Sequence, residues 1–342
     1  MQLYNRVDRK VLKERLAQMD EEFTTISFYK YHKIHQPEQF RDELYRAWYA
    51  MGVLGRIYIA HEGINAQLAL PSRNLEVFNT YLDTFSMFKG MRRNYAVEDG
   101  KSFFKLKIQV RDKIVADGIE DPSFDAGNCG VHLDAKRWNE LMEHPEVTVV
   151  DFRNHYESEV GHFKNAILPD VDTFREQLPK VAEELRDKKD KPVLMYCTGG
   201  IRCEKASAYM KHHGFNEVYQ LEGGIIKYAR DCKEKGIEPK FIGKNFVFDE
   251  RLHETITEDV IAHCHQCGEP ADTHINCANE ACHLLFIQCE KCAEKYEKCC
   301  TLACQEVIHL PIETQKELRK GKKNKQMIFK KGRAEHLLTL KG

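Results

Sequence analysis

A strand, a glycine-rich loop and a helix that follow one another directly constrain this chain more than any other feature. The apolar run PVLMYC (192–197) is typical of a buried strand, and a helix is predicted from Cys203 to His213. VTVVDFR (147–153) and EVYQLEGG (217–224) predict further strands, with helical segments between them. Short strands that alternate with helices predict an open α/β sheet, in which ligands bind at the carboxyl ends of the strands. Cys197 lies at such an end.

The loop after this strand has the composition of a thiolate site. Its residues are Cys197, Thr198, Gly199, Gly200, Ile201 and Arg202. The N–H groups of the loop can surround the sulfur and the following helix adds partial positive charge at its N-terminus, so the pKa of Cys197 is expected to fall. The two glycines allow backbone conformations closed to other residues, and Arg202 can hold an anion at the rim. Cys203 either resolves an oxidised sulfur on Cys197 or packs inward as an ordinary helix residue.

A different pattern precedes this domain. Strands and helices are expected in the order strand, helix, strand, strand, helix, strand, at residues 24–31, 37–52, 55–70 (two strands), 74–85 and 103–110, the last being the closing strand. This order predicts a ferredoxin-like (acylphosphatase-like) α+β sandwich over residues 1–120, with the α/β domain at 121–245. The apolar positions of such a sandwich more often form a core than an active site.

Nine of the thirteen cysteines fall within residues 264–304, which is too short and polar a segment to build its own core. They are Cys264, Cys267, Cys277, Cys282, Cys289, Cys292, Cys299, Cys300 and Cys304. Paired cysteines at this spacing are typical of tetrahedral zinc, and eight sulfurs suit two structural ions. The cysteines form four pairs in chain order, here called knuckles: 264/267, 277/282, 289/292 and 299 or 300 with 304. Either the first knuckle shares an ion with the third and the second with the fourth, or neighbouring knuckles share an ion. One of Cys299 and Cys300 is then not needed as a ligand. Disulfides or a reduced metal-free form, and an iron–sulfur cluster, are the alternatives for the region 246–310.

The charge is unevenly distributed. Residues 315–342 carry ten Lys/Arg against two acidic residues, although the whole chain has a net charge of −1. Such a tail (311–342) is either a nucleic-acid contact or a solvated segment. The candidate contacts are Arg319, Lys320, Lys322, Lys323, Lys330, Lys331 and Arg333. There is no apolar run long enough to span a membrane and no secretory signal at the start, so we expect a cytoplasmic protein.

Three runs resemble the rhodanese family. They are VVDFRNHYESEVGHFKNAI (149–167), YCTGGIRCEKA (196–206) and LEGGI (221–225), in the order that rhodaneses have. The resemblance implies that Cys197 is the reactive residue and that Asp151 and Arg153 form the supporting Asp-x-Arg strand. Related phosphatases have one more residue between Cys and Arg, so the spacing here is the sulfur-handling length.

The whole chain is similar to the bacterial oxygen-dependent tRNA uridine hydroxylase family. IAHEGINAQLALP (59–71) and CTGGIRCEKASAYM (197–210) carry the resemblance. It implies an oxidoreductase that converts the wobble uridine of tRNA to 5-hydroxyuridine with molecular oxygen, through the residue at Cys197. Protein partners are not indicated.

Two chemical roles are open for Cys197. Its thiolate can attack C6 of uridine and make C5 open to oxidation, or it can carry an oxidised or persulfide sulfur that mediates oxygen transfer. There is no flavin or nicotinamide signature and no evident iron triad. Two other functions are considered: a sulfurtransferase that carries a persulfide on Cys197, and a non-enzymatic tRNA-binding adaptor.

Overall fold

The computed structural model describes residues 7–97, 100–321 and 328. The chain divides into two compact units. The first comprises residues 1–153, 165–239 and 247–254, and the second residues 154–164, 240–246 and 255–342. The domain boundaries that we expect at residues 120, 245 and 310 stay predictions.

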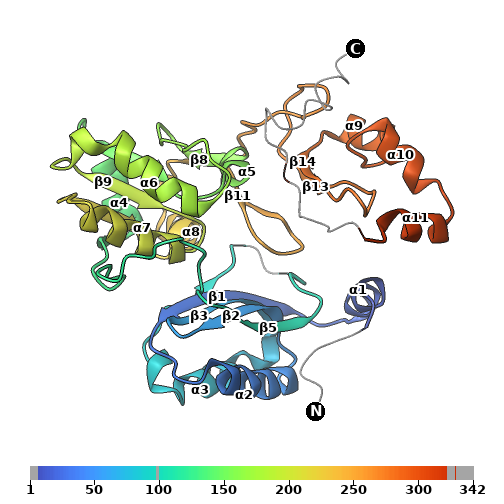
Figure 1. Cartoon of the computed structure of the whole chain (residues 1–342), viewed down its shortest axis with the longest axis horizontal. Helices are drawn as coiled ribbons and strands as arrows, with labels where there is room; N and C mark the ends of the chain where they lie inside the picture. Colours follow the sequence, from blue (N-terminus) through green and yellow to red (C-terminus); the bar gives the residue numbers. More distant parts are fainter. Residues whose placement is uncertain (1–6, 98–99, 322–327, 329–342) are drawn as a thin grey trace. The chain divides into compact units, whose positions relative to one another are not determined.

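The first unit begins with a five-stranded sheet in the order β4-β1-β3-β2-β5. Its strands are β1 (Phe23–Tyr31), β2 (Leu54–Ala60), β3 (Gly63–Pro71), β4 (Asn94–Tyr95) and β5 (Leu106–Val110). Helix α1 (Arg9–Gln18) precedes the sheet, and helices α2 (Pro37–Ala50) and α3 (Leu75–Asp83) lie on one of its faces (Figure 1). Alternation along the strands drives this arrangement: Ile57 is buried in the core with Trp48, whereas its neighbour Arg56 is exposed.

The strand that closes the ferredoxin-like order is β4, which pairs antiparallel with β1. Residues 103–110, which we expect to be the closing strand, instead supply β5, which pairs parallel with β2 at the opposite edge. This expectation is therefore wrong. A two-residue strand has too few positions to show an alternating pattern, so the sequence favours the longer, more periodic segment at 103–110.

The α/β part of the first unit has a four-stranded sheet in the order β6-β10-β9-β7, with all pairs parallel. Its strands are β6 (Val131–Leu133), β7 (Thr148–Asp151), β9 (Val193–Tyr196) and β10 (Val218–Leu221). Its helices are α4 (Ala135–Met142), α6 (Phe174–Glu184), α7 (Ile201–His212) and α8 (Gly224–Lys235). Strand β9 is buried along its whole length, as expected for a parallel strand covered on both faces.

The second unit is assembled from short elements. They are α5 (His155–Ser158), β8 (Gly161–Phe163), β11 (Phe241–Phe246), β13 (His274–Asn276), β14 (Leu285–Ile287), α9 (Glu290–Lys295), α10 (Leu302–Ile308) and α11 (Ile312–Arg319). Strands β8 and β11 pair antiparallel, and so do β13 and β14.

The remaining elements of the described chain are β12 (His253–Thr255) and the 3-10 helices Ser72–Asn74, Ser86–Phe88 and Arg186–Lys188.

Across the described part of the chain, no helix combines the length and apolar character needed to cross a membrane.

Candidate active site and metal centres

The candidate active site is the loop that joins β9 to α7. Cys197 follows the last residue of β9, and α7 begins four residues later at Ile201. Gly200 has a φ of +97°, a conformation that side chains disfavour, and its N–H donates to Cys197 Sγ at 3.2 Å. The sulfur therefore receives a backbone donor at the N-terminus of a twelve-residue helix.

Cys197 is fully buried, and burial is the largest influence on its thiol, favouring the neutral form. The hydrogen bond from the Cys203 thiol, the charge of Arg202 and the N–H groups of Cys203 and Gly200 outweigh burial. Together they lower the pKa of Cys197 from 9.0 to about 6. At neutral pH this residue is therefore mainly a thiolate.

The other loop residues shape the rim. Arg202 Nη2 donates to Thr198 Oγ1 at 3.2 Å, and its guanidinium lies 5.8 Å from the centre of the Phe248 ring. Thr198 and Gly200 are buried, whereas Gly199, Ile201 and Arg202 are partly exposed. A fixed cation thus lies at the partly exposed side of the loop, where it can attract an anionic group.

Cys203 is also completely buried. Burial is the main cause that raises the pKa of its thiol well above the usual range, followed by the hydrogen bond to Cys197 and the charge there. In the resting protein Cys203 is a neutral thiol that donates to a thiolate. The structure thus brings together the two sulfurs that a resolving role requires.

Asp151 and Arg153 form a buried ion pair next to the strand that carries Cys197. Arg153 Nη2 lies 2.6 Å from Asp151 Oδ2, both side chains are inaccessible to water, and the guanidinium lies 5.6 Å from the ring centre of Tyr196. Asp151 and Tyr196 are partners in the β7–β9 pair. These residues stabilise the strand end that supports the loop.

A second glycine turn holds the loop from its other side. The N–H groups of Ile225 and Ile226 donate to the carbonyls of Cys197 and Thr198 at 3.0 and 3.2 Å. A Cβ on Gly224 would lie 2.5 Å from the Cys197 carbonyl oxygen, so only glycine fits there. With its carbonyls engaged by α8, the loop can direct N–H groups at the sulfur.

Residues of the N-terminal sheet also contact the loop, and sequence reasoning does not identify them. Asn94 Nδ2 lies 3.3 Å from both the Gly199 and the Gly223 carbonyl oxygens. Tyr29 Oη lies 3.0 Å from the position that a Cβ on Gly200 would take. No local signal could have revealed these contacts, because Asn94 is 105 residues away from Gly199 in the chain.

Glu204, in the first turn of α7, links the helix to Tyr29 of β1 and to His132 of β6. It accepts hydrogen bonds from Tyr29 Oη at 2.7 Å and pairs with His132 Nε2 at 2.9 Å. Burial raises the pKa of Glu204, but the bonds from His132 and Tyr29 prevail and hold it at about 2. The carboxylate is therefore ionised at any physiological pH.

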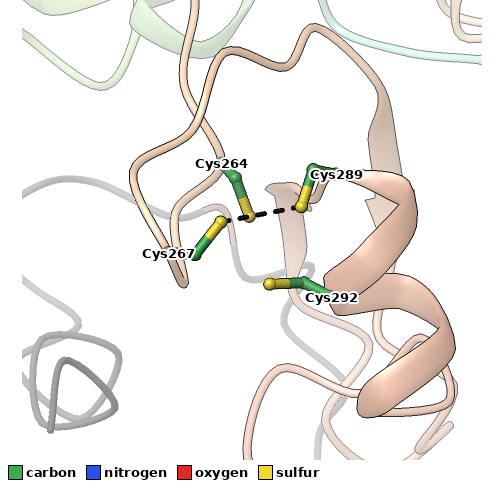
Figure 2. A group of neighbouring side chains, drawn as sticks. All are labelled: Cys264, Cys267, Cys289 and Cys292. Carbon is green, nitrogen blue, oxygen red and sulfur yellow. Dashed lines mark hydrogen bonds between the residues drawn. The ribbon is translucent and has the colours of Figure 1, made fainter.

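The cysteine-rich segment forms two groups of four sulfurs. Cys264, Cys267, Cys289 and Cys292 make the first group, and their side chains point toward one another (Figure 2). Cys277, Cys282, Cys300 and Cys304 make the second group. The first knuckle thus pairs with the third and the second with the fourth, which is the cross-braced alternative. Cys299 lies outside both groups.

Both groups fit a tetrahedral metal. In each one the four Sγ atoms lie within 4.8 Å of one another, and Cys267–Cys289 and Cys282–Cys300 are both 3.6 Å apart. Four thiolates at a Zn–S distance of about 2.3 Å would be separated by about 3.8 Å. A metal such as zinc therefore suits each group. His265, the neighbour of Cys264 in the chain, pairs with Glu159 at 2.7 Å and belongs to neither group.

The proposed tail contacts fall mostly outside the described residues. Arg319 ends α11 and forms an ion pair with Glu280, and Lys320 caps the same helix. Lys322, Lys323, Lys330, Lys331 and Arg333 lie beyond the residues that the structure describes.

Three family models match the chain. Their descriptions are UPF0176 acylphosphatase like domain (residues 23–114), Rhodanese-like domain (134–231) and Rhodanase C-terminal (242–305). They confirm the acylphosphatase-like and rhodanese-type domains predicted from the sequence.

Proteins named tRNA uridine(34) hydroxylase are similar to this chain over nearly their whole length. The one from Leptospira interrogans is 55% identical over 97% of this chain and 90% of its own length. Those from Enterobacter sp. (strain 638) and Cronobacter sakazakii are 54% and 53% identical, over 97% and 99% of this chain and 95% and 97% of theirs. Identity at this level over this length places the chain in a family: it belongs to the tRNA uridine(34) hydroxylases.

Proposed function

We propose that this chain hydroxylates C5 of uridine 34 in tRNA in the cytoplasm, with molecular oxygen as co-substrate and Cys197 as the catalytic nucleophile. The observation that carries the proposal is a thiol with a pKa of about 6 at the carboxyl end of β9, in a chain 55% identical to a tRNA uridine(34) hydroxylase. A thiolate is the nucleophilic form of cysteine, so this residue is ready to attack at neutral pH. Because Cys197 is fully buried, the surrounding side chains must move before a base can reach it.

The first step is addition of the Cys197 thiolate to C6 of the uracil ring. The S–C6 bond forms, and the electrons of the C5=C6 double bond move toward the C4 carbonyl, which makes C5 electron-rich. C5 can then react with dioxygen to give a hydroperoxide at C5, once one proton has been taken up. Arg202 and the loop N–H groups are placed to hold negative charge near the sulfur.

The second step needs two electrons, and Cys203 is the group we assign to it. While Cys197 is a thiolate, its hydrogen bond and charge help to keep Cys203 protonated; the S–C6 bond removes both effects. The Cys203 thiol then takes the distal oxygen of the hydroperoxide and becomes a sulfenic acid, leaving a hydroxyl on C5. Loss of the C5 proton and of Cys197 restores the C5=C6 bond. The two sulfurs finally condense to a disulfide and water, and an external thiol reduces the disulfide.

Nucleoside mass spectrometry of tRNA tests the role of Cys197. In cells that lack the gene, the wild-type chain should restore 5-hydroxyuridine, and Cys197→Ser should give none. Cys232→Ser is the matched control because Cys232 is a buried thiol of α8 outside the loop, and it should restore the nucleoside. Undiminished product with Cys197→Ser would end the proposal. If the wild-type chain converts thiosulfate and cyanide and Cys197→Ser does not, while neither forms 5-hydroxyuridine, the result would favour the sulfurtransferase.

Single-turnover chemistry tests the role of Cys203. Purified wild-type chain without added thiol should form about one 5-hydroxyuridine per chain together with a Cys197–Cys203 disulfide, seen by peptide mass spectrometry. Cys203→Ser should form no disulfide and lose most of the product. Normal turnover of Cys203→Ser would assign the electrons to another donor and leave the addition step intact.

The zinc ions are proposed as structural. All four positions of each group are filled by protein sulfur, so no position is open for a substrate. The basic tail stays a proposed second tRNA contact, through Arg319, Lys320 and the lysines and arginine that follow them.

A further inference from the structure

Helices α2 and α3 cover one face of the five-stranded sheet (Figure 1), and the opposite face carries charged, amide and tyrosine side chains. Residues paired directly across strands point to the same face. One such row runs Lys107, Arg56, Gln67, Ser27, Asn94 across β5, β2, β3, β1 and β4. Cations lie at one end of this row and amides follow toward the other.

A second row lies beside the first. It runs Gln109, Tyr58, Asn65, Tyr29 across β5, β2, β3 and β1. Two tyrosines thus alternate with two amide side chains. Tyr58 and Gln109 are partly exposed, so an aromatic ring is accessible near the cations of the first row.

Both rows end at the catalytic loop. Asn94, at the end of the first row, donates to the Gly199 carbonyl at 3.3 Å. Tyr29, at the end of the second, places its hydroxyl over Gly200. The two rows therefore run from the exposed β5 edge to Asn94 and Tyr29, which contact the loop of Cys197.

The β5 edge carries uncompensated positive charge. Arg56, Lys107 and Arg111 are exposed, and the ion pairs of the described residues include none of the three. Burial is the largest cause that lowers the pKa of Lys107, and every charged neighbour that adds to the effect is a cation: Arg56, Lys105 and Arg111. The Arg111 guanidinium also lies 5.7 Å from the Tyr58 ring centre. Such a cluster attracts an anionic partner.

We propose that this face, defined by the two rows and Arg111, binds the single-stranded loop of the RNA substrate and leads the target base to Cys197. The inference rests on the proposed function, which requires a loop nucleotide to reach the sulfur. Arg56 and Lys107 bind phosphates, Tyr58 stacks on a base, and the amide of Gln67 hydrogen-bonds to a base edge. An acidic protein would satisfy the cations, but it would not use an aromatic ring set among amides.

The test is equilibrium binding of the full chain to an anticodon stem-loop RNA with uridine at the wobble position. Arg56→Ala/Lys107→Ala should weaken binding at least about tenfold at 0.1 M salt and reduce the slope of log K against log salt by roughly 1.4, the value for two lost phosphate contacts on single strands. Lys136→Ala/Lys233→Ala is the charge-matched control, because both lysines are exposed on α4 and α8. This control should bind within about twofold of wild type.

Tyr58 separates base stacking from charge. Tyr58→Ala should weaken binding about tenfold, whereas Tyr58→Phe, which keeps the ring, should bind as wild type. Unchanged RNA binding by Arg56→Ala/Lys107→Ala and by Tyr58→Ala would overturn the proposal. Displacement of the RNA by polyglutamate at equal charge concentration would also overturn it, because the face would then recognise charge alone.

The same samples distinguish this inference from the proposed function. If the wild-type chain makes no 5-hydroxyuridine, the hydroxylase proposal fails while the binding comparison still decides the role of the face. If the wild type hydroxylates and the sheet variants both bind and hydroxylate normally, only the assignment of the face fails.

Discussion

Asn94 acts on Cys197 through a single peptide group. The Gly199 carbonyl and the Gly200 N–H belong to the same peptide, and in a trans peptide these two groups point in opposite directions. Asn94 Nδ2 donates to the carbonyl at 3.3 Å, and the N–H donates to Cys197 Sγ at 3.2 Å. A side chain of the N-terminal sheet therefore helps to hold the donor that stabilises the thiolate.

Loss of the hydrogen bond from Asn94 to the Gly199 carbonyl should raise the pKa of Cys197. In Asn94→Ala the pKa of Cys197 is expected to rise from about 6 by roughly one unit, since a hydrogen bond to a charged group is worth about 1.5–3 kcal/mol and is here weakened rather than lost. A higher pKa means less thiolate at pH 7, so alkylation by iodoacetamide should slow there and recover at pH 9. Peptide mass spectrometry at Cys197 follows the rate against pH.

Asn74→Ala is the control for this measurement. Asn74 Nδ2 donates to the Met51 carbonyl at 2.9 Å, so it has the same kind of bond in the same sheet domain without contact to the loop. Its alkylation profile should match wild type. If the pKa of Cys197 rises equally in Asn94→Ala and Asn74→Ala, the cause would be a general loosening of the sheet domain and not the orientation of the Gly199–Gly200 peptide.

At the scale of elements, the second unit depends on its sulfurs more than on its helices and strands. Strands β13 and β14 have three residues each, and α9 and α10 have six and seven. Elements this short are marginal on their own. The cross-braced groups join them: Cys289 and Cys292 at the start of α9 meet Cys264 and Cys267, which lie in a loop.

Metal content should follow this grouping. The purified chain is expected to hold two zinc ions by mass spectrometry of metals, and Cys292→Ser should hold about one. Cys299→Ser is the matched control, because Cys299 is buried beside Cys300 but belongs to neither group, and it should keep both ions. Since structural zinc contributes about 10 kcal/mol or more to folding, a chelator should unfold the second unit. Full zinc content in Cys292→Ser would exclude the assignment.

At the scale of the whole molecule, buried charges join the N-terminal sheet to α7, the helix that follows Cys197. Lys205 in α7 is almost completely buried, lies 2.6 Å from Glu62 Oε2 and also pairs with Asp117. Asp117 in turn pairs with Lys113 at 2.6 Å. Because the helix begins in the Cys197 loop, this network ties the position of the loop to that of the sheet.

Removal of the central cation should be costly. Lys205→Ala removes the cation beside Glu62 and leaves the buried Asp117 carboxylate paired with Lys113 alone, and it is expected to lower the free energy of unfolding by about 3 kcal/mol. Lys180→Ala, which breaks an exposed pair with Glu184, should cost less than about 1 kcal/mol. Urea unfolding at pH 7 measures both. Equal small losses would show that the Lys205 network does not couple the two parts.

Much of the fold and part of the site could be predicted because they are local in the chain. The strand from 192, the loop from Cys197 to Arg202 and the helix after it are contiguous, so one apolar run and two glycines identify them. The same holds for α2 and α3, whose apolar positions repeat with the helical period. Strand β4 is not predictable in this way because two residues show no period. The position of β5 in the sheet is not predictable either, because the pattern of a strand does not specify which strand it pairs with.

The sequence by itself determined the thiolate loop, since the sulfur, the helix that follows it and the arginine lie within six residues and their geometry follows from local backbone conformation. It also determined that the cysteines come in pairs. Only the tertiary structure decided which pairs meet, that Asn94 and Tyr29 border the loop, and that two rows of one sheet end beside Cys197. These contacts join residues far apart in the chain. They depend on strand register and on how whole elements pack, and neither leaves a signal in neighbouring residues.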